Sequence, residues 1–382
     1  MTVASLRIGI VAPRFAPFRG GLETYVEAAA AALAAEGASV TVITQAPRAA
    51  ELPREEWVDG YRIERHHLPI SDVFDVPSPA AARAASRPNR FDVVWLHSYH
   101  TPLAWMVAER STDPVVLTPH YHGVGHTPFR QALHRVYKPL GRRLMASSRQ
   151  IVVDTEAEAG LLLRDFPNQV GPEKITVVPP IVNDPVQGHL PFRTDAPVVL
   201  TAARQEPYKR TDLLIRAVAE LRDRGTAARL VVVGDGSALA AHRDLSTRLG
   251  ADDVVTFTGA VDDETLGRWW ASASLYASAS QQEAYGIGLA EALVAGIPVA
   301  ASAIPAHREV IDRAGSGAVA QLCRIDLPDA DAATRYAEAI TDLLAGSRTE
   351  SVRRCALPAA AEVAQQLLDA FTTAGERTRS TP

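Results

Sequence analysis

Two glutamates in the second half of the chain have the chemistry and spacing to hold a sugar linked to phosphate. They enclose the segment Glu283-Ala-Tyr-Gly-Ile-Gly-Leu-Ala-Glu291, in which a glycine turn precedes an amphipathic run. This order predicts a helix that begins between the two carboxylates and leaves unpaired backbone N–H groups at its start. Carboxylates accept hydrogen bonds from hydroxyl groups, and a helix N-terminus attracts anions. The segment therefore favours a sugar attached to a diphosphate as the ligand.

Two basic residues follow a predicted strand earlier in the same half. Arg204 and Lys209 lie in Arg204-Gln-Glu-Pro-Tyr-Lys209, directly after the apolar run Val198–Ala202. The carboxyl ends of parallel strands are where doubly wound sheets bind ligands. Two cations there could neutralise a diphosphate through charge-assisted hydrogen bonds. Taken alone, they could equally be solvated surface residues.

Two further strand ends in this half carry glycines. Gly234 and Gly236 end an apolar strand, where the absence of a side chain would let a ligand approach the backbone. The stretch Gly259-Ala-Val261 follows the next strand, and its backbone could contact a nucleobase. Each stretch could also be an ordinary strand-end turn.

The first half offers a glycine pair and a group of histidines. Gly20 and Gly21 follow the first predicted strand and open the first predicted helix, a position suited to an anion. His97 follows another strand, and His120-Tyr121-His122 follows the one after it. The histidine group allows a metal site, but no well-placed Asp, Glu or Cys accompanies it. We therefore expect no metal.

Strands and helices alternate along the chain, which predicts an α/β protein with two doubly wound parallel sheets. Its 382 residues suit two domains of similar size. The proline-rich stretch that begins at Val178 predicts a linker between residues 1–184 and 192–356. A C-terminal helix at about residues 359–374 is expected to pack back on the first domain. The segment Asp329-Ala-Asp331 is interpreted as a loop and helix N-cap rather than a metal site.

Composition excludes several classes of function. A net charge of −5 gives no support for nucleic-acid binding. The two cysteines suit a reducing compartment, and the absence of a leader or a long apolar run predicts a cytoplasmic protein. The basic stretch 130–149 allows at most a peripheral membrane contact, although a solvated helix or the wall of an acceptor site fits it better.

The four stretches of the second half resemble the donor-binding half of retaining glycosyltransferase family 4, the group 1 glycosyltransferases of GT-B fold. The similarity rests on Arg204 with Lys209, Gly234-Asp-Gly236, Phe257-Thr-Gly259 and the segment from Glu283 to Glu291. It implies two Rossmann-like domains that face a central cleft. It also implies the following site residues: Arg204, Lys209, Glu283 and His120 for catalysis, with Gly20, Gly21, Gly234, Gly236, Gly259, Val261, Tyr285, Gly286, Ile287 and Glu291 for donor binding.

In that resemblance, Arg204 and Lys209 hold the diphosphate, Glu283 the sugar and Glu291 the ribose. His120 corresponds to a histidine that touches both the donor sugar and the acceptor, and His97, Tyr121 and His122 join it as candidate acceptor residues. The implied reaction is retaining transfer from a nucleoside-diphosphate sugar to a hydroxyl of a small-molecule, lipid or glycan acceptor, without a metal or other cofactor. Bacterial natural-product or cell-envelope glycan synthesis is the expected context.

Two alternatives remain open from the residues alone. One is another enzyme of the same fold, such as a nucleotide-sugar epimerase or a phosphorylase. The other is a protein that binds nucleotide sugars without chemistry. The sequence does not identify the nucleotide, the sugar, the acceptor or the oligomeric state.

Overall fold

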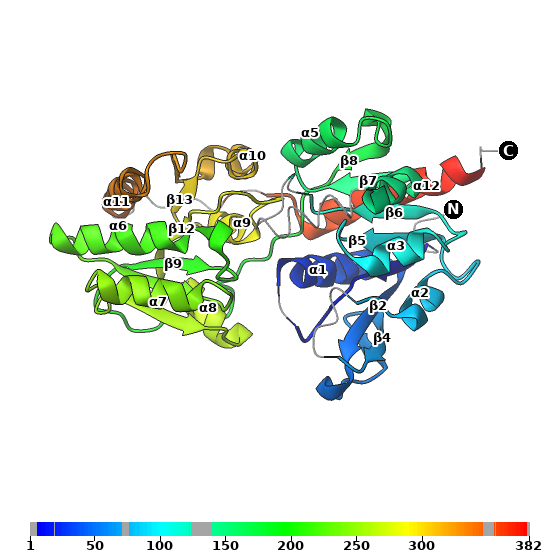
Figure 1. The fold of residues 1–382 in the computed structure, drawn as a ribbon, viewed down its shortest axis with the longest axis horizontal. Coiled ribbons are helices and arrows are strands. Elements are labelled where there is room, and N and C mark those ends of the chain that lie inside the picture. The colour runs from blue at the N-terminus through cyan, green and yellow to red at the C-terminus, as the bar shows by residue number, and fades with distance from the viewer. Residues whose placement is uncertain are drawn as a thin grey trace. The chain divides into compact units, whose positions relative to one another are not determined.

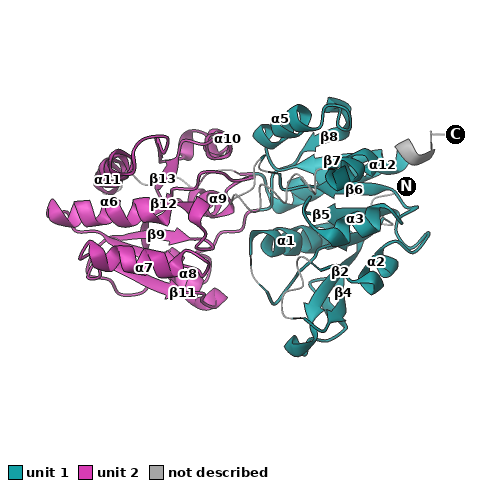
Figure 2. Cartoon of the chain, in the orientation of Figure 1, with its two compact units in different colours: residues 1–181, 358–382 teal, residues 182–357 magenta. Residues whose placement is uncertain are grey.

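The protein is described by a computed structural model. It describes residues 6–18, 20–70, 76–121, 123, 139–346, 355 and 357–379. The chain forms two compact units, shown in Figure 2. Unit 1 comprises Met1–Ile181 and Pro358–Pro382, and unit 2 comprises Val182–Leu357.

Unit 1 contains an eight-stranded sheet in the order β3-β4-β2-β1-β5-β6-β7-β8. All neighbouring strands are parallel except β3, which pairs with β4 in an antiparallel hairpin at the edge. Val and Ile dominate the central strands, as expected for strands buried on both faces. The strands are β1 (Arg7–Val11), β2 (Ser39–Pro47), β3 (Glu55–Val58), β4 (Tyr61–Leu68), β5 (Val93–His97), β6 (Val115–Thr118), β7 (Gln150–Val153) and β8 (Ile175–Val177).

Helices cover both faces of this sheet (Figure 1). On one face, α1 (Gly21–Ala35) and α12 (Ala360–Arg379) pack in a single apolar cluster. The other face is covered by α2 (Pro79–Ala85), α3 (Pro102–Ala108), a helical stretch over 139–147, and α5 (Glu156–Asp165). The last helix of the chain thus completes the core of the first unit.

Unit 2 contains a six-stranded, fully parallel sheet in the order β11-β10-β9-β12-β13-β14. The chain runs outward from β9 to β11 and then returns to the other side of β9 with β12, which is the doubly wound order. The strands are β9 (Val198–Ala202), β10 (Arg229–Val233), β11 (Val255–Gly259), β12 (Ala273–Ser278), β13 (Val299–Ser302) and β14 (Ala320–Cys323).

Two helical layers enclose this second sheet (Figure 1). One layer consists of α6 (Thr211–Asp223), α7 (Leu239–Arg248) and α11 (Asp329–Gly346). The other consists of α8 (Asp263–Ser272), α9 (Ile287–Val294) and α10 (Pro305–Ala314). The predicted fold class, two doubly wound parallel-sheet α/β domains, is confirmed.

The interpretation of Asp329-Ala-Asp331 as a loop and N-cap is wrong. Both acidic residues lie in the first turn of α11, which begins at Asp329, and Ala332 N donates to Pro328 O at 2.9 Å. Acidic residues in a first turn are favoured by the helix dipole. Asp329 also pairs with Arg210, at 2.6 Å. Among the helices described, none has the length and apolarity to cross a bilayer.

Candidate functional site

The charged residues Arg204, Lys209 and Glu283, predicted for the donor site, gather at the carboxyl ends of β9 and β12. These two neighbouring strands mark the point where the strand order reverses. Arg204 and Lys209 lie in the loop that follows β9, and Glu283 lies in the loop between β12 and α9. In doubly wound sheets, this reversal opens the crevice that binds the ligand.

Lys209 and Glu283 form a partly buried ion pair. The Lys209 Nζ lies 2.6 Å from Glu283 Oε1, and each side chain is 16% exposed. Burial raises the pKa of Glu283, but the charge of Lys209, together with hydrogen bonds from Lys209 and Ser280, outweighs it, so the net pKa is lowered. Burial likewise lowers the pKa of Lys209, and Glu283 outweighs it to raise the net value. Both groups therefore stay charged at neutral pH.

Arg204 differs from Lys209 in its surroundings. Its side chain is exposed, and none of the hydrogen bonds or ion pairs found among the described residues uses its guanidinium. Its positive charge nevertheless lowers the pKa of Lys209, so the two cations are close enough to interact. Lys209 is thus held in place by Glu283, whereas the guanidinium of Arg204 can still bind a ligand.

Helix α9 begins beside this pair without a side-chain cap. Its N-cap, Gly286, has φ 103°, in the left-handed region that favours glycine. A Cβ at this position would also come within 3.0 Å of the His307 ring. The first N–H groups of the helix, starting at Ile287, therefore have no capping side chain and are suited to bind an anion. The backbone of Tyr285, whose side chain is buried, leads into this turn.

His307 is a site residue that the sequence reasoning missed. It lies in the first turn of α10, fully buried, and its Nδ1 is 3.0 Å from the carbonyl oxygen of Ser302. Since a carbonyl can only accept, Nδ1 carries the proton and Nε2 is bare in the neutral ring. This turn follows β13, the neighbour of β12. Residues that follow the carboxyl end of β13 were not considered as site residues, and including them could have identified His307.

Glu291 lies inside α9, as expected, and its environment is unusual for a carboxylate. Burial raises its pKa from 4.5 to about 7. Gly288 lies one turn earlier on the same face of the helix, since residues three apart are neighbours on a helix surface. Among the described residues, no ion pair involves this carboxyl, and its ionised form can accept hydrogen bonds from neutral hydroxyl groups.

The glycines of the β10 and β11 loops serve packing. A Cβ at Gly234 would collide with Ala203 O, and one at Gly236 would collide with Gln205 O. Gly234 N also donates to Gly259 O at 2.8 Å. The loops after β9, β10 and β11 are thereby fastened to one another. These contacts favour the strand-end-turn interpretation for Gly234 and Gly236, while ligand contacts of Gly259 and Val261 remain predictions.

In unit 1, the N-terminus of α1 is partly occupied by the protein's own carboxylate. Glu23, in the first turn, is 3% exposed and pairs with Arg14 at 2.6 Å. A Cβ at the N-cap, Gly20, would lie 2.5 Å from Glu23 Oε2. Gly20 and Gly21 do lie at the helix start, as predicted, but Glu23 reduces the positive potential there.

The strands β5, β6 and β7 bring two histidines and an aspartate together. His120 Nδ1 lies 3.2 Å from Asp154 Oδ2, and its Nε2 lies 3.4 Å from His97 Nδ1. His120 adopts φ 48°, which is uncommon for a residue other than glycine and often marks functional positions. Its side chain is 17% exposed, whereas His97 and Asp154 are buried.

Tyr121 is also buried. Its hydroxyl donates to Asp165 at 2.8 Å, and its N–H donates to Glu158 at 2.6 Å. Of the four predicted acceptor residues, His120 is therefore the one that a ligand could reach among the three described, and His122 lies outside the described residues. The sequence reasoning missed Asp154 and Glu158. Their position at the end of β7 and the start of α5, beside the histidine strands, could have indicated them.

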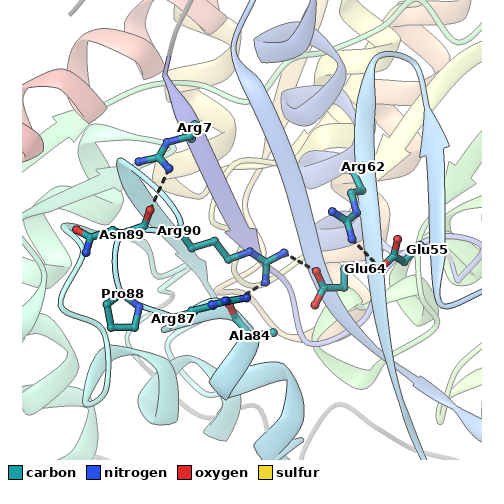
Figure 3. A pocket seen from close by; sticks show the side chains of 9 residues that line it. All are labelled: Arg7, Glu55, Arg62, Glu64, Ala84, Arg87, Pro88, Asn89 and Arg90. Atoms are coloured by element: carbon teal, nitrogen blue, oxygen red, sulfur yellow. Dashed lines mark hydrogen bonds and ion pairs between the residues drawn. The ribbon is translucent and has the colours of Figure 1, made fainter.

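No group of three or more metal-ligating side chains occurs within the part of the chain that the structure describes. A hollow of about 710 Å³ lies at the opposite, amino-terminal edge of the unit 1 sheet (Figure 3). Arginines and glutamates line it, and Arg62 pairs with Glu55 while Arg90 pairs with Glu64. None of the predicted site residues lines this hollow.

Comparison with solved structures identifies the fold. Sucrose-phosphate synthase from Thermosynechococcus elongatus superimposes with a TM-score of 0.72 at 18% identity, covering 96% of this chain and 94% of that one. Anabaena HepE, crystallised with UDP and glucose, gives a TM-score of 0.67 at 16% identity, covering 98% and 99%. The fold is therefore that of GT-B glycosyltransferases.

Sequence comparison narrows this class. Residues 184–356 match the family described as glycosyl transferases group 1, and residues 19–184 match glycosyltransferase family 4. D-inositol 3-phosphate glycosyltransferase of Streptomyces scabiei is 30% identical over 321 residues, which are 75% of this chain and 71% of the relative. The protein belongs to the group 1 glycosyltransferases of family 4, and it is a transferase.

Proposed function

We propose that the protein is a retaining glycosyltransferase that moves a sugar from a nucleoside-diphosphate sugar to a hydroxyl group of an acceptor. The observation that carries this proposal is the Lys209–Glu283 ion pair beside the uncapped N-terminus of α9. An anion-binding helix end and a carboxylate that can hold hydroxyl groups match the two parts of such a donor.

The donor's diphosphate would lie at the first N–H groups of α9, with Arg204 and Lys209 neutralising its charge. An ammonium group has three N–H donors, so Lys209 can keep its bond to Glu283 and still donate to phosphate oxygens. The second oxygen of Glu283 can then accept from a sugar hydroxyl. The pair would thus bind the sugar and the phosphate on either side of the bond that breaks.

The same groups would stabilise the reaction's transition state. As the bond from the anomeric carbon to the diphosphate breaks, negative charge grows on the leaving oxygen, where Arg204, Lys209 and the α9 N–H groups are placed to stabilise it. Because Glu283 is committed to Lys209, it is poorly suited to act as a nucleophile. This favours attack by the acceptor on the face that the diphosphate leaves, with retention and without a metal.

Similar proteins suggest the substrates. HepE of Anabaena was crystallised with UDP, and the relative from Streptomyces scabiei is named for D-inositol 3-phosphate. We therefore favour a UDP-sugar donor and a polyol acceptor, with His120 as the candidate acceptor-binding residue. A cytoplasmic enzyme of bacterial natural-product or cell-envelope glycan synthesis fits this chemistry.

A transfer assay tests the proposal. The purified protein is incubated with UDP-glucose or UDP-N-acetylglucosamine and with D-inositol 3-phosphate or myo-inositol, and products are analysed by mass spectrometry and proton NMR. We expect an α-linked product from an α-linked donor, and loss of product in Lys209→Ala but not in the matched control Lys174→Ala. A β-linked product would refute retention, and undiminished transfer by Lys209→Ala would refute the site.

A further inference from the structure

A tyrosine hydroxyl lies beneath the first turn of α9. Tyr276 comes from β12, and the residue is 4% exposed. Its ring stacks on Trp270 of α8, with centroids 5.1 Å apart and planes at 23°. Within the described part of the chain, none of the hydrogen bonds found uses its hydroxyl. The ring is therefore fixed while its polar end is available.

Gly288 makes the room for this hydroxyl. A Cβ at Gly288 would collide with the Tyr276 hydroxyl oxygen and would lie 3.1 Å from Cζ. The same Cβ position is 3.5 Å from Ala202 O, at the end of β9. The hydroxyl thus lies where β9, β12 and α9 meet, at the reversal point of the sheet.

The charges around the hydroxyl indicate which part of a donor it would contact. Burial, and then the charges of Glu283 and Glu291, raise the pKa of Tyr276 above its usual range. The hydroxyl therefore stays protonated beside two carboxylates, and it can exchange hydrogen bonds with a neutral hydroxyl group that also bonds one of them. Gly288 and Glu291 share a face of α9, which places the tyrosine on the Glu291 side of the helix start.

We propose that Tyr276 is a ligand-binding residue whose hydroxyl, reaching through the space left by Gly288, bonds the ribose of the donor together with Glu291. The site would then select a ribonucleoside diphosphate over a deoxyribonucleoside diphosphate. This inference rests on the proposed function, because it assigns one more contact to the same donor site. It adds a residue and a nucleotide class to that site.

Calorimetric titration with UDP and GDP, and with their 2′-deoxy and 3′-deoxy forms, tests this. Tyr276→Phe removes only the hydroxyl, and we expect about 5- to 10-fold weaker binding of the ribonucleotide, the range of one neutral hydrogen bond. Wild-type protein should bind the deoxy forms more weakly than the ribonucleotide. In Tyr276→Phe, this loss of affinity should be smaller by the same factor for at least one of the two deoxy forms. The matched control is Tyr336→Phe, because the hydroxyl of Tyr336 donates to Ser278 O at 2.9 Å. This variant should keep the wild-type affinity for the ribonucleotide and the wild-type loss of affinity for the deoxy forms.

A second pair of variants tests the fit between the two residues. Gly288→Ala should weaken ribonucleotide binding, because its Cβ displaces the phenol. In the Tyr276→Phe background, the same alanine should cost less, since the colliding oxygen is gone. Independent, additive effects of the two substitutions would contradict the contact.

The outcomes separate this inference from the proposed function. If wild-type protein binds the ribonucleotide and Tyr276→Phe binds each nucleotide as tightly as wild type does, the inference is overturned. Equal weakening for ribo- and deoxynucleotides would overturn the ribose assignment. If the wild-type protein binds none of these nucleotides, the proposed function itself fails, and the inference with it.

Discussion

The raised pKa of Glu291 makes donor binding depend on pH. With a pKa of about 7, roughly one tenth of this carboxyl is ionised at pH 6 and nine tenths at pH 8. If only the carboxylate binds ribose well, the KM for the donor should be about tenfold higher at pH 6 than at pH 8. Steady-state kinetics across pH 5.5–8.5, with saturating acceptor, measures this change.

The same shift predicts an opposite effect on stability. Because the folded-state pKa of Glu291 lies above the ordinary value of 4.5, its contribution is fully present below about pH 4.5 and is lost as pH rises through 7. A shift from 4.5 to about 7 corresponds to at most about 3.5 kcal/mol, at about 1.4 kcal/mol per pH unit. Glu291→Gln should therefore raise the free energy of unfolding at pH 8 but not at pH 4.5.

Glu264→Gln, on the exposed side of α8, is the matched control and should change neither property. Glu291→Gln should also remove the pH dependence of donor KM in the range 6–8. A wild-type KM that is flat across this range, or a Glu291→Gln variant that keeps the wild-type profile, would refute the reasoning. Chemical denaturation at the two pH values supplies the stability measurement.

Three other predictions concern the Arg204 cation, the contact between His120 and Asp154, and the need for a metal. Arg204→Ala should weaken UDP binding while leaving the melting temperature unchanged, because its exposed guanidinium supports no contact among the described residues; a large drop in melting temperature would count against this. Asp154→Asn should shift the His120 tautomer, seen in the imidazole ¹⁵N shifts, and reduce transfer; unchanged shifts would show that the pair is not formed in solution. Chelation with EDTA should leave transfer unaffected, and activity that returned only with added Mg²⁺ would contradict the metal-free proposal.

Much of the fold could be predicted from the sequence, because buried parallel strands appear as short apolar runs between helical patterns. The carboxyl ends of such strands must share one edge, so Arg204, Lys209 and Glu283 could be grouped from their positions after predicted strands. The glycine at Gly286 and the run from Leu289 likewise located the start of α9 to within two residues.

Contacts between different strand ends were harder to predict. Asp154 and His307 belong to turns that carry no motif, and only the strand order places them beside His120 and Gly286. The match of Tyr276 to Gly288 depends on the depth of a side chain beneath a helix, which residue spacing does not report. Residue spacing likewise does not indicate that Glu23 fills the N-terminus of α1, or that Lys209 and Glu283 pair with each other.

The central claim is that the donor's diphosphate binds the N-terminus of α9. Hydrogen–deuterium exchange with and without UDP measures this directly. We predict slower exchange in peptides that cover residues 283–294 and no change in peptides that cover 84–92, a stretch that includes several residues lining the arginine-rich hollow of unit 1. Protection of 84–92 with none at 283–294 would contradict the account.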